Sequence, residues 1–202
     1  MSKPQGSTRM LKPTKAAISQ SKKEYNSQLV LTTTDAGNSY FSEKSGGYLI
    51  AMKGHNLSSL EAEAGKYLAD FGLQVHLTPE GAGYEIYATH SYVKDGKTHY
   101  KFPEGKINMF TFEQKTPSKI ESSIERSVRQ AILHANSKHA DIAVIYDKHN
   151  LFDRNDIENG MKLYQSKFKK WETKGVKAVI AISHDGGVFE HQFDKQKKEQ
   201  EA

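Results

Sequence analysis

Residues 102–115 read Phe-Pro-Glu-Gly-Lys-Ile-Asn-Met-Phe-Thr-Phe-Glu-Gln-Lys, and they hold the most informative pattern in the sequence. Its second part, 106–115, has the composition of a strand that ends before Pro117. Side chains two residues apart on a strand lie on the same face. We therefore expect Glu113 and Lys115 to project together from one side of a sheet.

A carboxylate beside an ammonium group on one sheet face can support hydrolytic chemistry. The carboxylate of Glu113 can hold a divalent cation, and Lys115 can orient or deprotonate a water molecule. Glu104 stands just before the strand, between Pro103 and Gly105, where a second carboxylate would complete the ligand set of the cation. An ordinary ion pair on a solvated strand is the alternative, because a Glu-x-Lys triplet alone is a weak signal.

Strands and helices are predicted on both sides of this stretch. A turn at Asp95 and Gly96 joins two of the strands in a hairpin. The expected strands cover 47–52, 73–77, 84–93, 98–102, 141–146, 176–182 and 188–193, and the expected helices cover 58–71, 119–136 and 155–173. This order predicts an α/β fold, a mixed central β-sheet flanked by helices, with a hairpin insertion.

The composition separates one domain from two tails. Hydrophobic residues make up 36% of the 202 residues, and the first and last stretches contain almost no large apolar side chains. Such segments bury too little surface to offset the entropy of ordering. We predict a disordered basic N-terminal tail over 1–28, a folded domain over 29–193 and a charged C-terminal tail over 194–202.

Charge and residue usage exclude several classes of protein. The formal net charge of +5 favours a polyanionic partner only mildly. The chain has no cysteine, which rules out disulfides and thiolate zinc sites. No apolar run reaches the length of a membrane span, and no apolar segment follows the N-terminal lysines as in a secretory signal. We expect a cytoplasmic site of action and no membrane partner.

Several short motifs occur in an order that is typical of one nuclease superfamily. They are Gly46-Gly-Tyr-Leu49 before the first helix, Glu61 in a helix that ends Leu-Ala-x-x-Gly-x-x-Val over 68–75, Pro103-Glu-Gly105, Phe112-Glu-Gln-Lys-Thr116, a helix with Ser127-Val-Arg-Gln-Ala131, and the late strands at 141–147 and 176–183. From Gly46 to about Phe193 the chain resembles the PD-(D/E)XK nucleases. Within them it is most similar to the C-terminal tRNA-nuclease domains of contact-dependent growth inhibition and related polymorphic toxins.

The resemblance implies a restriction-endonuclease-like core and a set of site residues. Glu61, Glu104 and Glu113 would be metal ligands for Mg²⁺ or Mn²⁺, and Glu104, Glu113, Lys115 and Gln130 would be catalytic. The chain departs from the family at Glu104, where the family has Asp. Glu85 and Asp95 are alternatives for that ligand, although Asp95 is explained by its turn.

Helix geometry gives two of these residues a second interpretation. Glu61 follows Ser58 at the spacing of a capping box, so a structural cap and a metal ligand are equally weighted. Ser123, Ser127, Gln130 and His134 form a polar ridge beside the apolar stripe of their helix. That ridge would line a substrate cleft, or it is an ordinary boundary between helix faces. The nine histidines show no zinc motif, although His55 is placed to approach the cleft.

The function that these features predict is a metal-dependent phosphodiesterase that cleaves tRNA or other structured RNA. The tyrosines at 84, 87, 92 and 100 near the hairpin would stack unpaired bases if they are exposed, and otherwise they pack the sheet. A DNA endonuclease of the same fold and an inactive nucleic-acid-binding or interaction module are the alternatives. The resemblance also implies an immunity protein as a partner.

Overall fold

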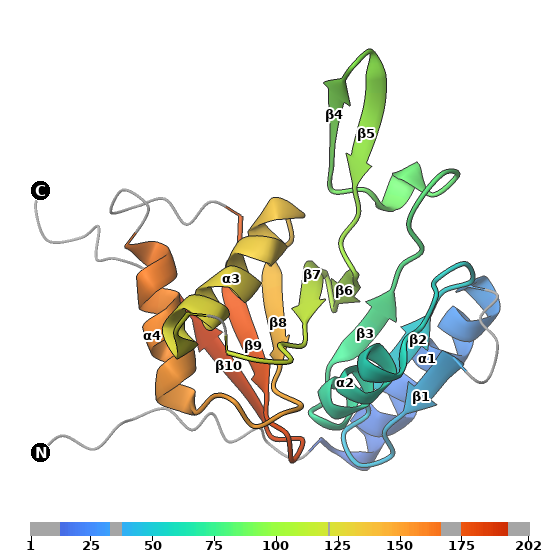
Figure 1. Cartoon of the computed structure of the whole chain (residues 1–202). Helices are drawn as coiled ribbons and strands as arrows, with labels where there is room; N and C mark the ends of the chain where they lie inside the picture. Colours follow the sequence, from blue (N-terminus) through green and yellow to red (C-terminus); the bar gives the residue numbers. More distant parts are fainter. Residues whose placement is uncertain (1–12, 33–37, 121, 167–174, 194–202) are drawn as a thin grey trace, which may run out of the picture.

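The computed structural model describes residues 13–32, 38–120, 122–166 and 175–193. In these residues eight strands form one mixed sheet in the order β1-β2-β3-β6-β7-β8-β9-β10, and β4 and β5 form a separate hairpin (Figure 1). The elements are α1 Lys15–Thr32, β1 Ser39–Phe41, β2 Tyr48–Ala51, α2 Ser59–Asp70, β3 Gln74–Leu77, β4 His90–Lys94, β5 Lys97–Lys101, β6 Gly105–Ile107, β7 Phe110–Lys115, α3 Ile124–Ser137, β8 Ile142–Tyr146, α4 Arg154–Gln165, β9 Ala178–Ile182 and β10 Val188–Gln192. The predicted fold class is confirmed.

Helices connect the parallel strands of the sheet. β2 and β3 run parallel and are joined through α2, while β7, β8 and β9 run parallel and are joined through α3 and α4. The remaining neighbours, including β3 with β6 and β6 with β7, are antiparallel. Parallel pairs need such crossover connections, which bring helices onto the faces of the sheet.

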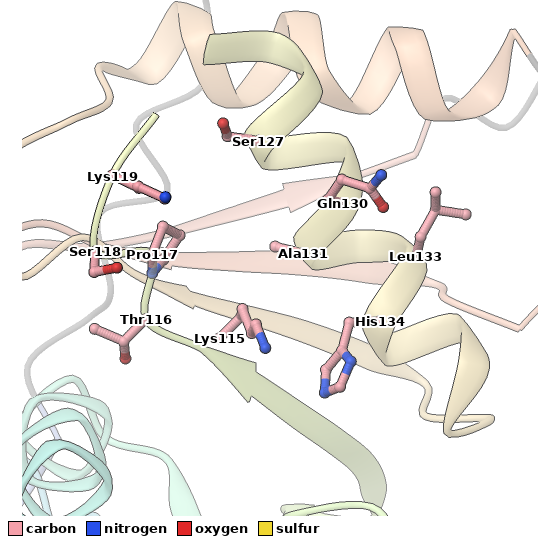
Figure 2. A pocket seen from close by; sticks show the side chains of 10 residues that line it. All are labelled: Lys115, Thr116, Pro117, Ser118, Lys119, Ser127, Gln130, Ala131, Leu133 and His134. Carbon is pink, nitrogen blue, oxygen red and sulfur yellow. The ribbon is translucent and has the colours of Figure 1, made fainter. Parts of the chain in front are cut away.

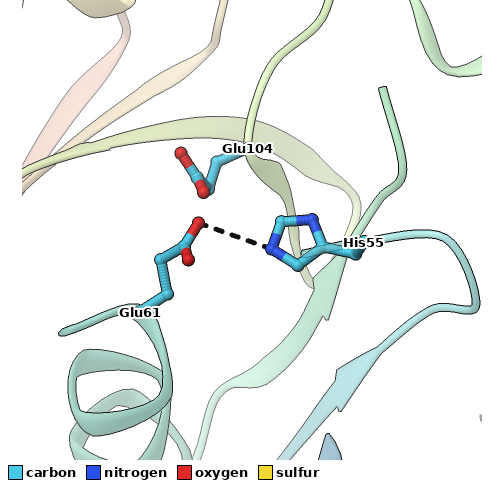
Figure 3. A group of neighbouring side chains, drawn as sticks. All are labelled: His55, Glu61 and Glu104. Carbon is cyan, nitrogen blue, oxygen red and sulfur yellow. Dashed lines mark ion pairs between the residues drawn. The ribbon is translucent and has the colours of Figure 1, made fainter. Parts of the chain in front are cut away.

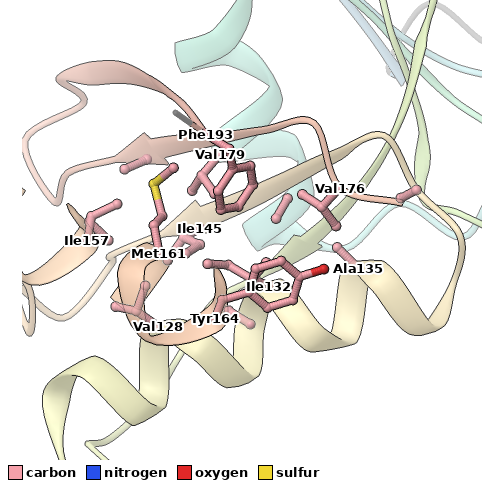
Figure 4. Packing of buried hydrophobic residues seen from close by; sticks show 14 residues of the cluster. Val128, Ile132, Ala135, Ile145, Ile157, Met161, Tyr164, Val176, Val179 and Phe193 are labelled. Carbon is pink, nitrogen blue, oxygen red and sulfur yellow. The ribbon is translucent and has the colours of Figure 1, made fainter. Parts of the chain in front are cut away.

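β8 shows why the sheet has helices on both faces. All five of its residues are buried, and alternate side chains belong to different cores. Ala143 and Ile145 lie in a hydrophobic cluster with residues of α3 and α4. The same cluster includes Ile132 of α3 and Val179 of β9 (Figure 4). Val144 lies in the opposite cluster, with residues of α2, β2 and β3. A strand covered on both faces is a continuous apolar run.

α2 begins and ends where the sequence predicts. The Ser58 hydroxyl accepts a hydrogen bond from the amide of Glu61, and the Glu61 carboxylate accepts one from the amide of Ser58, so both halves of the capping box are present. Leu68 and Ala64 face the core. The positive φ of Gly72 follows the last turn.

The strand predicted over 106–115 is instead two strands, β6 and β7, joined by a tight turn. Asn108 takes a left-handed backbone conformation, with φ of 54°. Its amide donates to the carbonyl of Gln74 at 2.7 Å, and its side-chain oxygen accepts from the amide of Gln74 at 3.1 Å. Asparagine tolerates this conformation better than most residues. The hydrogen bonds to β3 therefore turn the chain at Asn108, where we predicted one continuous strand.

Two other element boundaries differ from the prediction. Residues 84–89 do not continue the strand that we predicted over 84–93, because Glu85 accepts a hydrogen bond from the amide of Gly83 and a 3₁₀ turn forms at Glu85–Tyr87. The helix predicted over 119–136 starts at Ile124, since Ser123 is its N-cap. The hairpin turn at Asp95 and Gly96 is confirmed, and both residues have positive φ.

The predicted N-terminal tail is wrong for its second half. Residues 15–28 belong to α1, which packs at the edge of the sheet through Tyr25. The Tyr25 ring lies 5.6 Å from the ring of Tyr48 and 5.3 Å from that of Phe41, and Ser21 donates a hydrogen bond to the carbonyl of Gly46. These contacts connect α1, none of whose residues is buried, to the edge of the sheet. Residues 1–12, 194–202 and the predicted end of the helix at 167–173 lie outside the described residues.

In the described parts of the chain, no helix combines the length and the apolar character that crossing a bilayer requires.

Candidate metal and nuclease site

Three side chains of types that can ligate a metal meet where β3 and β6 run beside the start of α2. One ligand atom from each of His55, Glu61 and Glu104 lies within 4.8 Å of the other two (Figure 3). The three residues come from the loop after β2, the first turn of α2 and the residue before β6. Their approach depends on the parallel pairing of β2 with β3 and the antiparallel pairing of β3 with β6.

The ring of His55 is fixed in one orientation. Its Nδ1 lies 3.0 Å from the carbonyl oxygen of Thr78, which can only accept, so Nδ1 carries a proton. In the neutral ring Nε2 then holds the lone pair. Nε2 is buried, the side chain is 8% exposed, and Nε2 faces Oε1 of Glu61 at 3.4 Å, beyond the geometry of a hydrogen bond. In the neutral ring this nitrogen has the arrangement of a metal-ligating histidine, and in the protonated ring it forms an ion pair with Glu61.

Glu61 serves the helix cap and faces the site at the same time. Its Oε2 accepts from the amide of Ser58 at 2.6 Å, while its Oε1 lies 3.4 Å from Nε2 of His55. Burial raises the pKa of Glu61, but His55 and Ser58 outweigh that effect and leave the pKa below its usual value. Burial lowers the pKa of His55, and the contacts with Glu61 and the Thr78 carbonyl raise it to a net value above normal. The two interpretations of Glu61 are therefore compatible.

Gly105 explains how Glu104 reaches this place. A Cβ atom at Gly105 would come within 2.0 Å of the carbonyl oxygen of His76 on β3. Only glycine allows the two backbones to approach so closely. The amide of Glu104 donates to Oε2 of Glu113 at 3.1 Å, so the buried carboxylate of β7 fixes the backbone of Glu104.

Glu113 is a buried residue whose carboxyl has a raised pKa. The residue is 6% exposed, and burial raises the pKa of its carboxyl to about 7 although Lys138 and Lys115 oppose the change. Its Oε1 lies 2.8 Å from Nε2 of His134, whose pKa is lowered by burial and by neighbouring lysines. A carboxyl with a raised pKa and an imidazole with a lowered pKa share one proton readily near neutral pH.

Lys115 lies in an open pocket on the other side of His134. The pocket has a volume of about 660 Å³ (Figure 2), and Lys115, Gln130 and His134 point into it. Its other lining residues are Thr116, Pro117, Ser118, Lys119, Ser127, Ala131 and Leu133. Three members of the polar ridge predicted on α3 therefore line this pocket, while the fourth, Ser123, caps the helix.

The structure places the predicted site residues in two adjoining groups. Glu61 and Glu104 lie together with His55, and Lys115 and Gln130 lie in the pocket. Glu113 stands between the two groups, bonded to the amide of Glu104 on one side and to His134 on the other.

Neither alternative to Glu104 belongs to the ligand group found among the described residues. Glu85 accepts the amide of Gly83 in its own turn, and Asp95 is part of the hairpin turn. Glu104 is therefore the acidic residue that the structure offers at this position.

Two histidines and one carboxylate of the site carry no clear signal in the sequence. The sequence marks His55 only by its position after Gly54, and His134 only as part of a polar ridge. Glu80 is exposed, yet it lies near enough to raise the pKa of both Glu113 and His55. The contact of His55 with Thr78 joins residues 23 apart in the chain, so no local motif marks it.

The fold and the site define an α/β protein with a histidine–carboxylate cluster beside a basic pocket. No family model matches the chain, and no curated protein matches its sequence. Among solved structures, the chain is similar to one chain of the "CdiA-CT/CdiI toxin and immunity complex from Burkholderia pseudomallei", with 19% identity and a TM-score of 0.45 over 70% of this chain and 96% of that chain. A likeness at this level transfers neither a site nor an activity, so the family resemblance in the sequence stays a prediction.

Proposed function

We propose that the chain is a metal-dependent phosphodiesterase that cleaves nucleic acid. The convergence of His55, Glu61 and Glu104 within 4.8 Å carries this proposal. A cation there would lie beside the buried Glu113 and near the lysine of the adjoining pocket. Hydrolysis of a phosphodiester requires positive charge near the phosphate oxygens and a group that removes a proton from water.

The residues present fit a divalent cation. In its neutral form His55 offers a buried lone pair that is already oriented, and Glu61 keeps one carboxylate oxygen facing it. Mg²⁺ strongly prefers oxygen ligands, whereas transition ions accept imidazole readily. We therefore propose Mn²⁺ ahead of Mg²⁺. When bound, the cation would lower the pKa of a water molecule and offset the negative charge of the phosphate.

The protein's own residues then have distinct tasks. Glu113 holds the amide of Glu104 and, with its pKa near 7, exchanges a proton with His134. Lys115 is exposed in the pocket, where its ammonium group binds a phosphate oxygen and stabilises developing charge. Gln130 lies beside it and donates a hydrogen bond that orients the substrate. Glu113 as a third carboxylate ligand remains part of the proposal.

We propose structured RNA, with tRNA first, as the substrate. The sequence offers no helix dense in the Arg, Asn and Gln side chains that read the major groove of DNA. Unpaired bases are recognised by stacking on aromatic rings, and Tyr92 is 40% exposed. The ring of Tyr100 lies on the other face of the hairpin, 6.2 Å from the ring of Phe102, and fits this role less well. Tyr84 and Tyr87 are half-buried and fit this role less well. An immunity protein as partner remains a prediction of the sequence resemblance.

The test of activity is a comparison of initial cleavage rates. Purified protein is incubated with total tRNA or with linear duplex DNA at matched salt, in Mn²⁺, in Mg²⁺ and in chelator. Matched salt is essential because binding to either polymer depends steeply on ionic strength. We expect tRNA to be cleaved faster and only with metal. Faster cleavage of duplex DNA would show that DNA is the preferred substrate. Cleavage in chelator would contradict the proposed metal dependence.

Metal binding is tested without any substrate. A cation that binds only the folded state raises the melting temperature in proportion to its affinity. We expect Mn²⁺ to raise the melting temperature of the wild type and not that of His55→Ala. His149→Ala, which removes an exposed histidine far along the chain, is the matched control and should respond like the wild type. Equal shifts in all three proteins would show that His55 is no ligand.

A further inference from the structure

The two faces of the β4–β5 hairpin differ in chemistry. Cross-strand pairing aligns His90 with Lys101, Tyr92 with His99 and Lys94 with Lys97. Because side chains alternate along a strand, these six residues share one face. The other face carries Ser91, Val93, Thr98 and Tyr100. One face thus holds only rings and lysines, and the other holds only uncharged side chains. We call the first the ring–lysine face.

The rings of the ring–lysine face are stacked in a row. His90 lies 6.5 Å from Tyr92 with an interplanar angle of 15°, and Tyr92 lies 5.3 Å from His99 with an angle of 18°. His139, just after the C-cap of α3, continues the row at 4.4 Å from His90. All four residues are exposed, and Nζ of Lys101 lies 5.7 Å from the centre of the Tyr92 ring.

The row of rings does not pack in a hydrophobic core, because all of β4 and all but the last residue of β5 are exposed. Figure 1 shows the hairpin standing away from the main sheet. Its inner end reaches the proposed site. The Thr89 hydroxyl donates to the carbonyl of Lys138 at 2.5 Å, and Lys138 and Lys101 both lower the pKa of His134. His134 in turn contacts Glu113.

We propose that the ring–lysine face binds an unpaired, single-stranded segment of the nucleic acid and leads it toward Glu113. Aromatic rings stack bases of any sequence, and lysines between them neutralise the phosphates of the same strand. The occupant is negatively charged because this face has three lysines and no acidic residue. This inference rests on the proposed function for its purpose, but the binding that it predicts does not depend on cleavage.

The test measures binding of a fluorescent oligoadenylate RNA to the full chain in chelator, where no metal-dependent cleavage occurs. The double variant Tyr92→Ala/His99→Ala should weaken binding at least about tenfold, since a stacked base contributes enough to change affinity by that factor or more. Tyr100→Ala removes the same side chain from the opposite face of the same hairpin, and it should bind like the wild type. Melting temperatures confirm that each variant is folded.

The lysines are tested separately through salt. The triple variant Lys94→Gln/Lys97→Gln/Lys101→Gln should lower the slope of log affinity against log salt by about 2, because each phosphate contact of a single strand contributes about 0.7. A folded Tyr92→Ala/His99→Ala protein with wild-type affinity would overturn the proposal, as would an equal loss in Tyr100→Ala. Failure of the wild type to bind the RNA would also overturn the proposal. Binding as expected without cleavage would contradict the proposed function alone.

Discussion

β7 and β8 are neighbouring parallel strands that use burial in opposite ways. Glu113 on β7 pairs in register with Ala143 on β8, and Lys115 pairs with Ile145. All of β8 is apolar and buried on both faces, whereas β7 turns one aromatic residue to the core and a buried carboxylate to α3. An apolar strand thus supports its neighbour. It fixes the backbone on which a carboxylate can be held out of water, although that burial is unfavourable by itself.

α3 reinforces the same division, because it covers both strands. Ile132 and Ala135 pack in the apolar cluster over β8, while His134 between them in sequence reaches Glu113. Gln130 lies one turn earlier and lines the pocket beside Lys115. The helix therefore stabilises the fold with one face and completes the proposed site with the other.

Removal of the buried carboxylate of β7 should change activity most. We expect Glu113→Ala to lower cleavage by about 10³-fold or more, because the carboxylate, its charge and the support of Glu104 are lost together. Single-turnover cleavage of tRNA in Mn²⁺ measures this. Gln114→Ala alters the next residue, which faces the other side of the sheet, and should keep near wild-type activity. Full activity of Glu113→Ala would end the metal-nuclease hypothesis.

The apolar strand is tested by stability instead of activity. Ile145 is fully buried, and Ile145→Ala should lower the free energy of unfolding by about 2–5 kcal/mol, as for other large-to-small core substitutions. Denaturant unfolding measures this change. The exposed Val93 of the hairpin is the control, because Val93→Ala removes methyl groups from a solvated site. Equal losses in the two variants would contradict the division between core and hairpin.

The sequence predicts well those features that are settled by neighbours in the chain. The capping box of Ser58 and Glu61 and the Asp95–Gly96 turn are local, and both are present. The turn at Asn108 was missed because it depends on hydrogen bonds to Gln74, 34 residues away. α1 was missed because Tyr25 makes contacts that composition does not reveal.

The candidate site follows the same rule. The spacing of Glu113 and Lys115 places both on the α3 side, as a strand requires. The sequence resemblance directed attention to Glu104, and the structure adds Gly105 as the reason that Glu104 can approach β3. His55 and His134 join the site through contacts between distant segments, which spacing along one chain cannot encode.

A smaller effect is expected at Lys115, which is exposed and contributes charge without holding the metal. Lys115→Ala should reduce the cleavage rate by about 10²-fold, as expected when one group that stabilises developing charge is removed. The Mn²⁺-dependent rise in melting temperature should stay unchanged. Lys106→Ala, at an exposed position on β6, controls for loss of one positive charge. A lost Mn²⁺ response in Lys115→Ala would show that the lysine shapes the metal site itself.

Glu113 also makes stability depend on pH. Its pKa is about 7 in the folded protein against an ordinary value of 4.5, so between these pH values the folded state binds more protons than the unfolded state. Stability therefore falls as pH rises through this window. Glu113→Gln removes the titrating group, so between these pH values its free energy of unfolding should rise relative to that of the wild type by about 3 kcal/mol.

Denaturant unfolding in chelator at a series of pH values measures this difference. Glu190→Gln changes an exposed carboxylate on β10 and should follow the wild type at every pH. A difference between Glu113→Gln and the wild type that does not vary with pH would mean that Glu113 titrates at its ordinary pKa.

The smallest change concerns the length of one side chain. The nucleases that the sequence resembles have Asp where this chain has Glu104, and the backbone of Glu104 is fixed by Glu113 and by the close approach at Gly105. Glu104→Asp keeps the charge and shortens the reach by one methylene, so we expect cleavage within about tenfold of the wild type, in either direction. Glu104→Gln keeps the length and removes the charge, and it should lower both cleavage and the Mn²⁺-dependent rise in melting temperature. If Glu104→Gln matches the wild type in both measurements, Glu104 is not a ligand and the cation must be held by other carboxylates.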